Sequence, residues 1–164
     1  MNQHELNTLL DYHYWARDRI LEATAKLTPE QYNADLGNSF RSIRETVVHV
    51  FSAESIWCQR WHGESPPGML SAADYPDVAS LRSGWSTLEA KMRTFLDSLG
   101  EDGIQRVIAY KTFAGQEFRQ IYWQMLQHVV NHASYHRGQV TTMIRQLKAD
   151  PPQSMDLIAF YREH

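Results

Sequence analysis

The chain has 164 residues, of which 43% are hydrophobic and 21% charged, a balance typical of one folded domain with a substantial core. Its net charge of −3 and lack of a Lys/Arg cluster argue against a nucleic-acid surface, and no apolar run approaches the ~18–20 residues of a membrane span. The single cysteine, Cys58, excludes an internal disulfide and fits a reducing compartment. With no signal peptide visible at the N-terminus, we expect a single domain over residues 1–164 in the cytoplasm.

The first predicted helix covers residues 3–27. Its apolar side chains recur every three or four residues, and His13 falls within the stripe that they form. The helix is expected to end at Thr28-Pro29, because a proline cannot continue a helix interior. Residues 31–41 are predicted to connect it to the next helix.

A second helix is predicted from Ile43 to about His62. Ser42 and Glu45 have the spacing of a capping box, a pattern that marks the start of a helix. At about 100° per residue, His49 falls at the margin of the apolar face of this helix. The proline- and glycine-rich residues 64–76 are predicted as a loop.

The third predicted helix, residues 78–99, has the most regular pattern in the chain. Its apolar positions alternate spacings of three and four without a break, at Val78, Leu81, Trp85, Leu88, Met92, Phe95 and Leu99. Such a seam packs at the shallow crossing angle of a helix bundle. Gly100 and Gly103 are expected to end the helix. Residues 104–118 break the helical rhythm and predict a short hairpin or an extended excursion.

A fourth long helix is predicted over residues 119–148, with a further short helix at 155–161. Gly138 lies in the middle of the long helix, where glycine costs up to ~1 kcal/mol relative to alanine. We therefore expect another helix to approach the backbone closely at Gly138. Four helices of this length predict an all-α four-helix bundle with a short excursion before the last long helix.

His128, His132 and His136 follow one another at four-residue spacing in the fourth helix. Residues four apart lie on one helix face, but His128 and His136 are separated by roughly 12 Å of axial rise, so at most two neighbours can share one metal ion. His132 and His136 fall inside the apolar stripe, and His128 falls at its edge. A metal would satisfy two stacked core imidazoles, each of which otherwise costs about 1–3 kcal/mol if a ring nitrogen is unpaired.

The competing interpretation is a pair of core histidines that hydrogen-bond to tyrosine, serine or backbone groups. If a metal is bound, a third ligand must come from a facing helix, and the residues alone leave four candidates: His13, His49, Glu54 and Cys58. No glutamate lies between His132 and His136, so the helix lacks the general base of the zinc proteases.

Several short motifs match a known family. They are Tyr14-Trp15-Ala16, His49 with Glu54 and Trp57, His128-Val129-Val130-Asn131-His132 running into His136-Arg137-Gly138-Gln139, and Pro151-Pro152 followed by Asp156-Leu157-Ile158. In these motifs the chain resembles the DinB/YfiT-like family of four-helix-bundle metalloproteins over essentially its whole length. It departs from the family at Arg17, where many members have an asparagine after the Trp-Ala pair, so any role of that asparagine does not carry over.

The resemblance implies a bundle of unusual connectivity, often a homodimer, that holds one divalent metal ion through three histidines. Carried over position by position, these ligands are His49, His132 and His136, with zinc or nickel as the expected metal. His128 and His13 are then expected only as neighbours of the ligands. Family members with known activity include transferases that use low-molecular-weight thiols such as bacillithiol or mycothiol.

We therefore expect a metal-dependent thiol S-transferase that acts on a small molecule and has no nucleic-acid or membrane partner. Two alternatives stay open. One is a metal-stabilised bundle or dimerisation module without catalysis. The other is a metal-dependent hydrolase, for which Glu54 is the distant candidate base.

Overall fold

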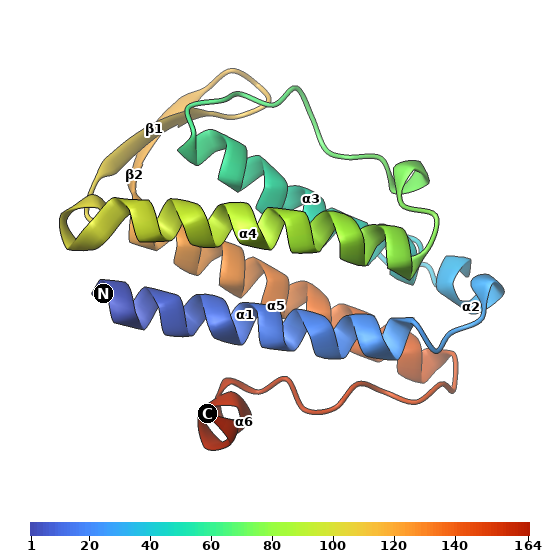
Figure 1. Ribbon diagram of the computed structural model, residues 1–164. Helices are drawn as coiled ribbons and strands as arrows, with labels where there is room; N and C mark the ends of the chain where they lie inside the picture. The colour runs from blue at the N-terminus through green and yellow to red at the C-terminus, as the bar shows by residue number, and fades with distance from the viewer.

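Four long helices form most of the protein, whose computed structural model describes residues 1–164. They are α1 (Gln3–Thr24), α3 (Ile43–Trp61), α4 (Val78–Gly103) and α5 (Tyr122–Gln146), and they lie side by side (Figure 1). α1 and α3 occupy opposite corners of the bundle, and each packs against both α4 and α5. α1 and α5 run in one direction, while α3 and α4 run in the other, so the connection from α3 to α4 crosses the length of the bundle (Figure 1).

Short elements complete the fold. The strands β1 (Val107–Lys111) and β2 (Glu117–Ile121) pair antiparallel, with Val107 opposite Ile121, and confirm the predicted hairpin. The fold is therefore mostly helical, and the all-α bundle description holds only roughly. The remaining elements are α2 (Pro29–Asn33), the 3-10 turn η1 (Ala72–Asp74) and α6 (Leu157–Glu163).

Capping side chains fix where the helices begin. The Ser42 hydroxyl accepts a hydrogen bond from the backbone N–H of Glu45, as predicted for a helix that starts at Ile43. The Glu45 carboxylate, however, accepts from the N–H of Arg41 rather than from that of Ser42. The second hydrogen bond of the predicted capping box therefore comes from Arg41, one residue before the expected donor, and the helix still starts at Ile43.

Three predicted boundaries differ from the structure. α1 ends at Thr24, and Thr28 and Pro29 instead start the unpredicted helix α2, where proline at the first position costs no hydrogen bond. α5 begins at Tyr122 rather than near residue 119, because residues 117–121 pair with β1. α4 continues to Gly103 across a break at Gly100, whose φ of 62° favours glycine.

The core lies between the inward faces of the four long helices. The predicted seam of α4 is confirmed at its centre, since Leu81, Trp85, Leu88 and Met92 are all buried. Toward the end of α4 the buried position is Leu96, and Phe95 and Leu99 are only partly buried. None of the helices combines the length and the apolarity that crossing a bilayer requires.

The prediction that another helix approaches the backbone closely at Gly138 was wrong. A Cβ atom added at Gly138 would meet no other atom within 4 Å. The close approach occurs instead at Gly84 in α4, where an added Cβ would lie 3.3 Å from ring atoms of both Phe51 and Tyr75. Periodicity showed that Gly138 is helical but not which neighbour, if any, faces it.

These two glycines give a matched pair for a stability test. We expect Gly138→Ala to raise the free energy of unfolding by about 0.5–1 kcal/mol, because alanine loses less backbone entropy in a helix and meets no clash here. Gly84→Ala gains the same propensity but must displace Phe51 or Tyr75, so its net gain should be smaller or negative. Urea unfolding measures both, and equal effects of the two substitutions would contradict the packing described above.

Candidate metal centre

Three histidines from two helices converge at the seam between α3 and α5. The Nε2 atom of His132 lies 3.1 Å from Nε2 of His49 and 3.1 Å from Nε2 of His136. The ligand atoms of the three residues all lie within 4.8 Å of one another. The three histidines are therefore close enough together to hold one metal ion.

The helix geometry explains this convergence. His132 and His136 are four residues apart in α5 and lie one above the other, while His49 reaches them from α3, which packs against α5. Zinc–nitrogen bonds of 2.0–2.1 Å at tetrahedral angles place two ligand nitrogens roughly 3.3 Å apart. The observed 3.1 Å contacts are near this separation, so the residues fit a metal ion. Imidazole ligands suit zinc, nickel, iron and copper, so the ligand set by itself does not select one metal.

A hydrogen bond to Gln139 orients His136. The Nδ1 atom of His136 lies 2.7 Å from Oε1 of Gln139 one turn further along α5, so Nδ1–H donates to the amide oxygen. The proton is then held on Nδ1, and the lone pair of Nε2 points toward the other two histidines. Such outer contacts fix the tautomer of metal-binding histidines in known sites. Gln139 belongs to the motif His136-Arg137-Gly138-Gln139, and its i+3 spacing from His136 is the sequence signal for this contact.

Aromatic side chains form the walls of the site. The ring of Phe40, in the segment before α3, stacks on His49 with centroids 4.0 Å apart. Tyr135 approaches His136 edge-on at 5.1 Å and is itself 66% exposed. Phe40 lies in the segment predicted only as a connection between helices. Its position beside the histidines was not predicted, because no periodic pattern extends from residue 40 to α5.

His49 and His132 are neutral at pH 7. Burial, reinforced by the neighbouring His136, lowers the pKa of His49 to about 4. Burial and the neighbouring imidazoles, His136 first among them, lower the pKa of His132 to about 4 as well. Neutral imidazole is the form that binds metal ions.

Two of the candidate residues lie outside this cluster. His128 is exposed and packs against the ring of Trp57, with its own ring centroid 5.9 Å from that of His132. Cys58 is buried in the apolar core, where burial raises the pKa of its thiol to about 11. A thiol in that environment stays protonated and does not act as a ligand.

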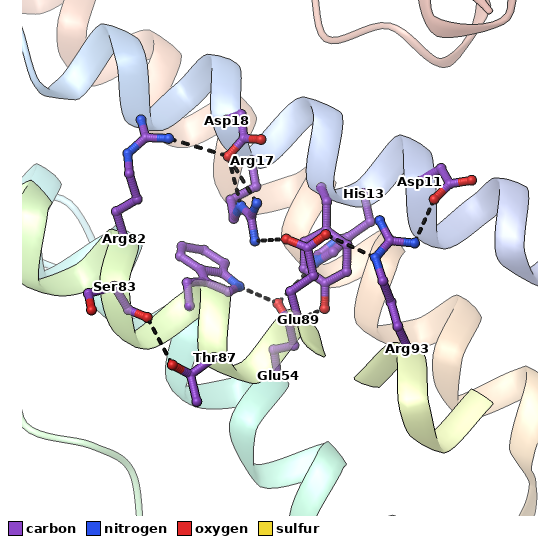
Figure 2. A network of polar contacts seen from close by, with 12 residues as sticks. Asp11, His13, Arg17, Asp18, Glu54, Arg82, Ser83, Thr87, Glu89 and Arg93 are labelled. Carbon is purple, nitrogen blue, oxygen red and sulfur yellow. Dashed lines mark hydrogen bonds and ion pairs between the residues drawn. The ribbon is translucent and has the colours of Figure 1, made fainter. Parts of the chain in front are cut away.

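Glu54 belongs to a buried polar network that includes His13 (Figure 2). Its carboxylate, 1% exposed, accepts hydrogen bonds from Tyr14 Oη at 2.7 Å, from Trp85 Nε1 at 2.6 Å and from His13 Nε2 at 2.9 Å. Burial is the largest influence on this carboxyl and disfavours its charge. The pKa of Glu54 nevertheless lies below its usual range, because His13, Tyr14 and Trp85 together outweigh burial. Glu54 thus joins α1, α3 and α4 and is not a ligand.

His13 lies next to the histidine cluster but is not part of it. Burial lowers the pKa of His13, so the ring is neutral and carries its proton on Nε2, facing Glu54. Its Nδ1 atom is fully buried and has no hydrogen-bond partner. His13 and His132 line the same narrow internal cavity, which places His13 behind the metal-site histidines rather than among them.

Arg17 occupies the position where the family often has asparagine, and it faces α4 rather than the histidine cluster. Its guanidinium forms ion pairs with Glu89 at 2.7 Å and Asp18 at 3.0 Å (Figure 2). Glu89 also pairs with Arg93, which reaches back to Asp11 on α1. Arg17 therefore helps to hold α1 against α4.

The low pKa of Glu54 predicts how stability depends on pH. A carboxyl whose folded pKa is depressed adds stability above its unfolded pKa, about 4.3, and loses it as the pH falls through the folded value. We expect wild type to exceed Glu54→Gln in unfolding free energy by a constant amount from pH 7 to about 5 and by less below about pH 4.3. Urea unfolding at each pH measures the difference. A difference that stays constant down to pH 3 would show that the pKa of Glu54 is not depressed, and one that grows as the pH falls would show that Glu54 is protonated in the folded protein.

Comparison with known proteins identifies a family that matches the fold. The family model described as "DinB family" matches residues 1–162. Protein DinB of Bacillus subtilis strain 168 is 23% identical over 145 residues, covering 84% of this chain and 83% of that protein. The uncharacterized protein YizA of the same organism is 21% identical over 141 residues, covering 86% of this chain and 87% of its own length.

A solved structure shares the fold. The crystal structure of a DinB-like protein from Bacillus cereus ATCC 10987 aligns with a TM-score of 0.66 and covers 89% of this chain and 95% of that chain, at 17% sequence identity. The family model spans nearly all of the chain, and the fold matches a DinB-like structure. The chain belongs to the DinB family.

Proposed function

We propose that the protein is a metal-dependent enzyme that uses His49, His132 and His136 to hold one divalent ion, zinc or nickel, and transfers a low-molecular-weight thiol to a small-molecule electrophile. The observation that carries the proposal is the convergence of three imidazole Nε2 atoms, with contacts of 3.1 Å, at a half-buried seam. Three protein ligands leave a coordination position open, as in catalytic rather than structural zinc sites.

A bound divalent ion supplies Lewis acidity, which favours the deprotonated form of a thiol. Side chains of the protein orient the ligands and contact the substrate. Gln139 holds His136 in the tautomer that directs its lone pair into the site. Phe40 and Tyr135 place aromatic rings beside His49 and His136, where they are available to contact the carbon skeleton of the substrate.

The absence of an available base favours a thiol over water as the nucleophile. Glu54, the carboxylate that a hydrolase would need, already accepts three hydrogen bonds and is 1% exposed. A free thiol ionises with a pKa of about 8.5, against 15.7 for bulk water. A thiol therefore needs less help from the protein to lose its proton.

A second candidate is a metal-stabilised bundle or homodimer without catalysis. The three histidines link α3 to α5, so a bound ion would stabilise the bundle whether or not any reaction occurs. The apolar side chains of Leu157, Ile158 and Tyr161 on α6 are 38%, 56% and 54% exposed, and they are the face we propose for a dimer.

The two functions are separated by two measurements on one preparation. Protein loaded with zinc or nickel is incubated with low-molecular-weight thiols and alkylating electrophiles, and conjugate formation is followed with and without a chelator. The chelator is expected to abolish conjugation and also to lower the melting temperature. If the chelator lowers the melting temperature but no thiol is conjugated, only the non-catalytic function remains. If the wild-type protein binds no metal, both proposed functions are excluded.

A further inference from the structure

A second concave site lies on the opposite side of α5 from the histidine cluster. It is a cavity of about 640 Å³ between α5 and the segment 152–157 that leads into α6. This volume falls within the range of roughly 300–1,000 Å³ typical of small-molecule sites. Thr141, on its wall, is nine residues from His132, which is about half a turn around the helix. The cavity is therefore separate from the metal centre.

A buried arginine lines this cavity. Arg137 is 4% exposed; its guanidinium donates a hydrogen bond to the Ser134 hydroxyl at 2.8 Å and lies 5.7 Å from the centroid of the Tyr12 ring. Neither contact involves a carboxylate. The ion pairs that arginines form in this protein belong to other residues, namely Arg17, Arg19, Arg41, Arg82 and Arg93. Arg137 thus places a buried positive charge beside a cavity with no carboxylate in contact with it.

No carboxylate forms an ion pair with this arginine. The field of Glu54 favours the charged form of Arg137, but the Glu54 oxygens accept their hydrogen bonds from His13, Tyr14 and Trp85 and form none with the guanidinium. Asp156 lies in the cavity wall, where its carboxylate accepts a hydrogen bond from Ser154. Arg145, exposed and in no ion pair, adds a second positive charge to the lining. The cavity therefore has two cationic groups and one anionic group.

A buried charge is costly unless it is paired, and guanidinium groups pair best with the two oxygens of a carboxylate or phosphate. We propose that this cavity binds a small oxyanion, with Arg137 as the deep contact and Arg145 as the contact at the rim. The proposal does not depend on the metal centre, because the two sites use opposite faces of α5.

The test uses the full-length protein and two probes, inorganic phosphate and acetate, at constant ionic strength maintained with chloride. Binding is followed by NMR through the side-chain N–H signals of the arginines and by calorimetry. We expect millimolar or tighter binding of at least one probe, with the Arg137 signal shifting most. The probe that binds more tightly distinguishes a tetrahedral from a planar ligand.

Four variants make the assignment specific. Arg137→Lys keeps the charge but loses the planar fork and should weaken binding about tenfold, and Arg145→Ala should weaken it several-fold. Gly138→Leu adds a side chain in the cavity lining while keeping both arginines, so it should block binding even if the Arg137 variant does not fold. His136→Ala, at the metal centre, should bind the probes as wild type does.

Arg106→Ala is the matched control, since Arg106 is exposed and lies outside the cavity. Unchanged affinity is expected for this variant. The proposal is overturned if neither probe binds the wild type, or if Arg145→Ala and Gly138→Leu bind as tightly as Arg106→Ala does.

Discussion

Replacing His136 with alanine is expected to lower the affinity for a divalent metal by more than about 100-fold. Loss of an outer partner of a metal ligand typically costs 10–100-fold, and His136 itself supplies one of three converging nitrogens. The remaining pair, His49 and His132, would hold the ion by two bonds only. Equilibrium dialysis against zinc or nickel, followed by elemental analysis of the protein, measures both stoichiometry and affinity.

His128→Ala provides the control for this experiment. His128 lies one turn from His132 on the same helix, but it is exposed and outside the cluster. Its removal should leave one metal ion per chain with unchanged affinity. If His128→Ala loses the metal and His136→Ala keeps it, the ligand pair of α5 would have to be assigned as His128 and His132.

Replacing Glu54 with alanine is expected to lower the free energy of unfolding by about 3–5 kcal/mol, because a buried donor left without an acceptor costs about 1–3 kcal/mol and three donors are affected. The substitution leaves the buried donors of His13, Tyr14 and Trp85 without an acceptor (Figure 2). It also opens a void between α1, α3 and α4. Such a loss is a large fraction of the stability of a domain of this size. Urea unfolding monitored by tryptophan fluorescence measures it.

A partly exposed glutamate on the neighbouring helix gives the matched comparison. Glu89 forms ion pairs with Arg17 and Arg93, but its side chain is 22% exposed, and surface pairs are worth about 0–1 kcal/mol each. Glu89→Ala should therefore cost much less than Glu54→Ala. Similar losses for both substitutions would mean that the Glu54 network adds little beyond an ordinary ion pair.

The sequence by itself determined the elements that depend on local periodicity and local capping. The three- and four-residue spacing located the long helices, and the Ser42 cap located the start of α3. The break in that spacing located the β1–β2 hairpin. The four-residue spacing of His132 and His136 placed both on one face of α5, because a helix repeats every 3.6 residues whatever surrounds it.

Relations between helices were decided only by the tertiary structure. Spacing alone left His13, His49, Glu54 and Cys58 open as candidates for the third position beside the α5 pair. The packing of α3 against α5 brings His49 to 3.1 Å from His132, and the packing of α1 and α4 directs Glu54 toward Tyr14 and Trp85. Phe40 contacts His136 and Arg17 pairs with Glu89, and both partners lie in segments distant in the sequence.

The physical reason is that the direction of a side chain around its helix axis is set locally, whereas the position of one helix along another is not. Periodicity fixes the direction of each side chain around its own helix axis, since that angle follows from local backbone geometry. How far one helix slides along another depends on how ridges and grooves of both surfaces fit together, which no single segment encodes. The sequence thus determined that α5 presents two imidazoles on one face, and the packing of α3 decided that His49 meets them.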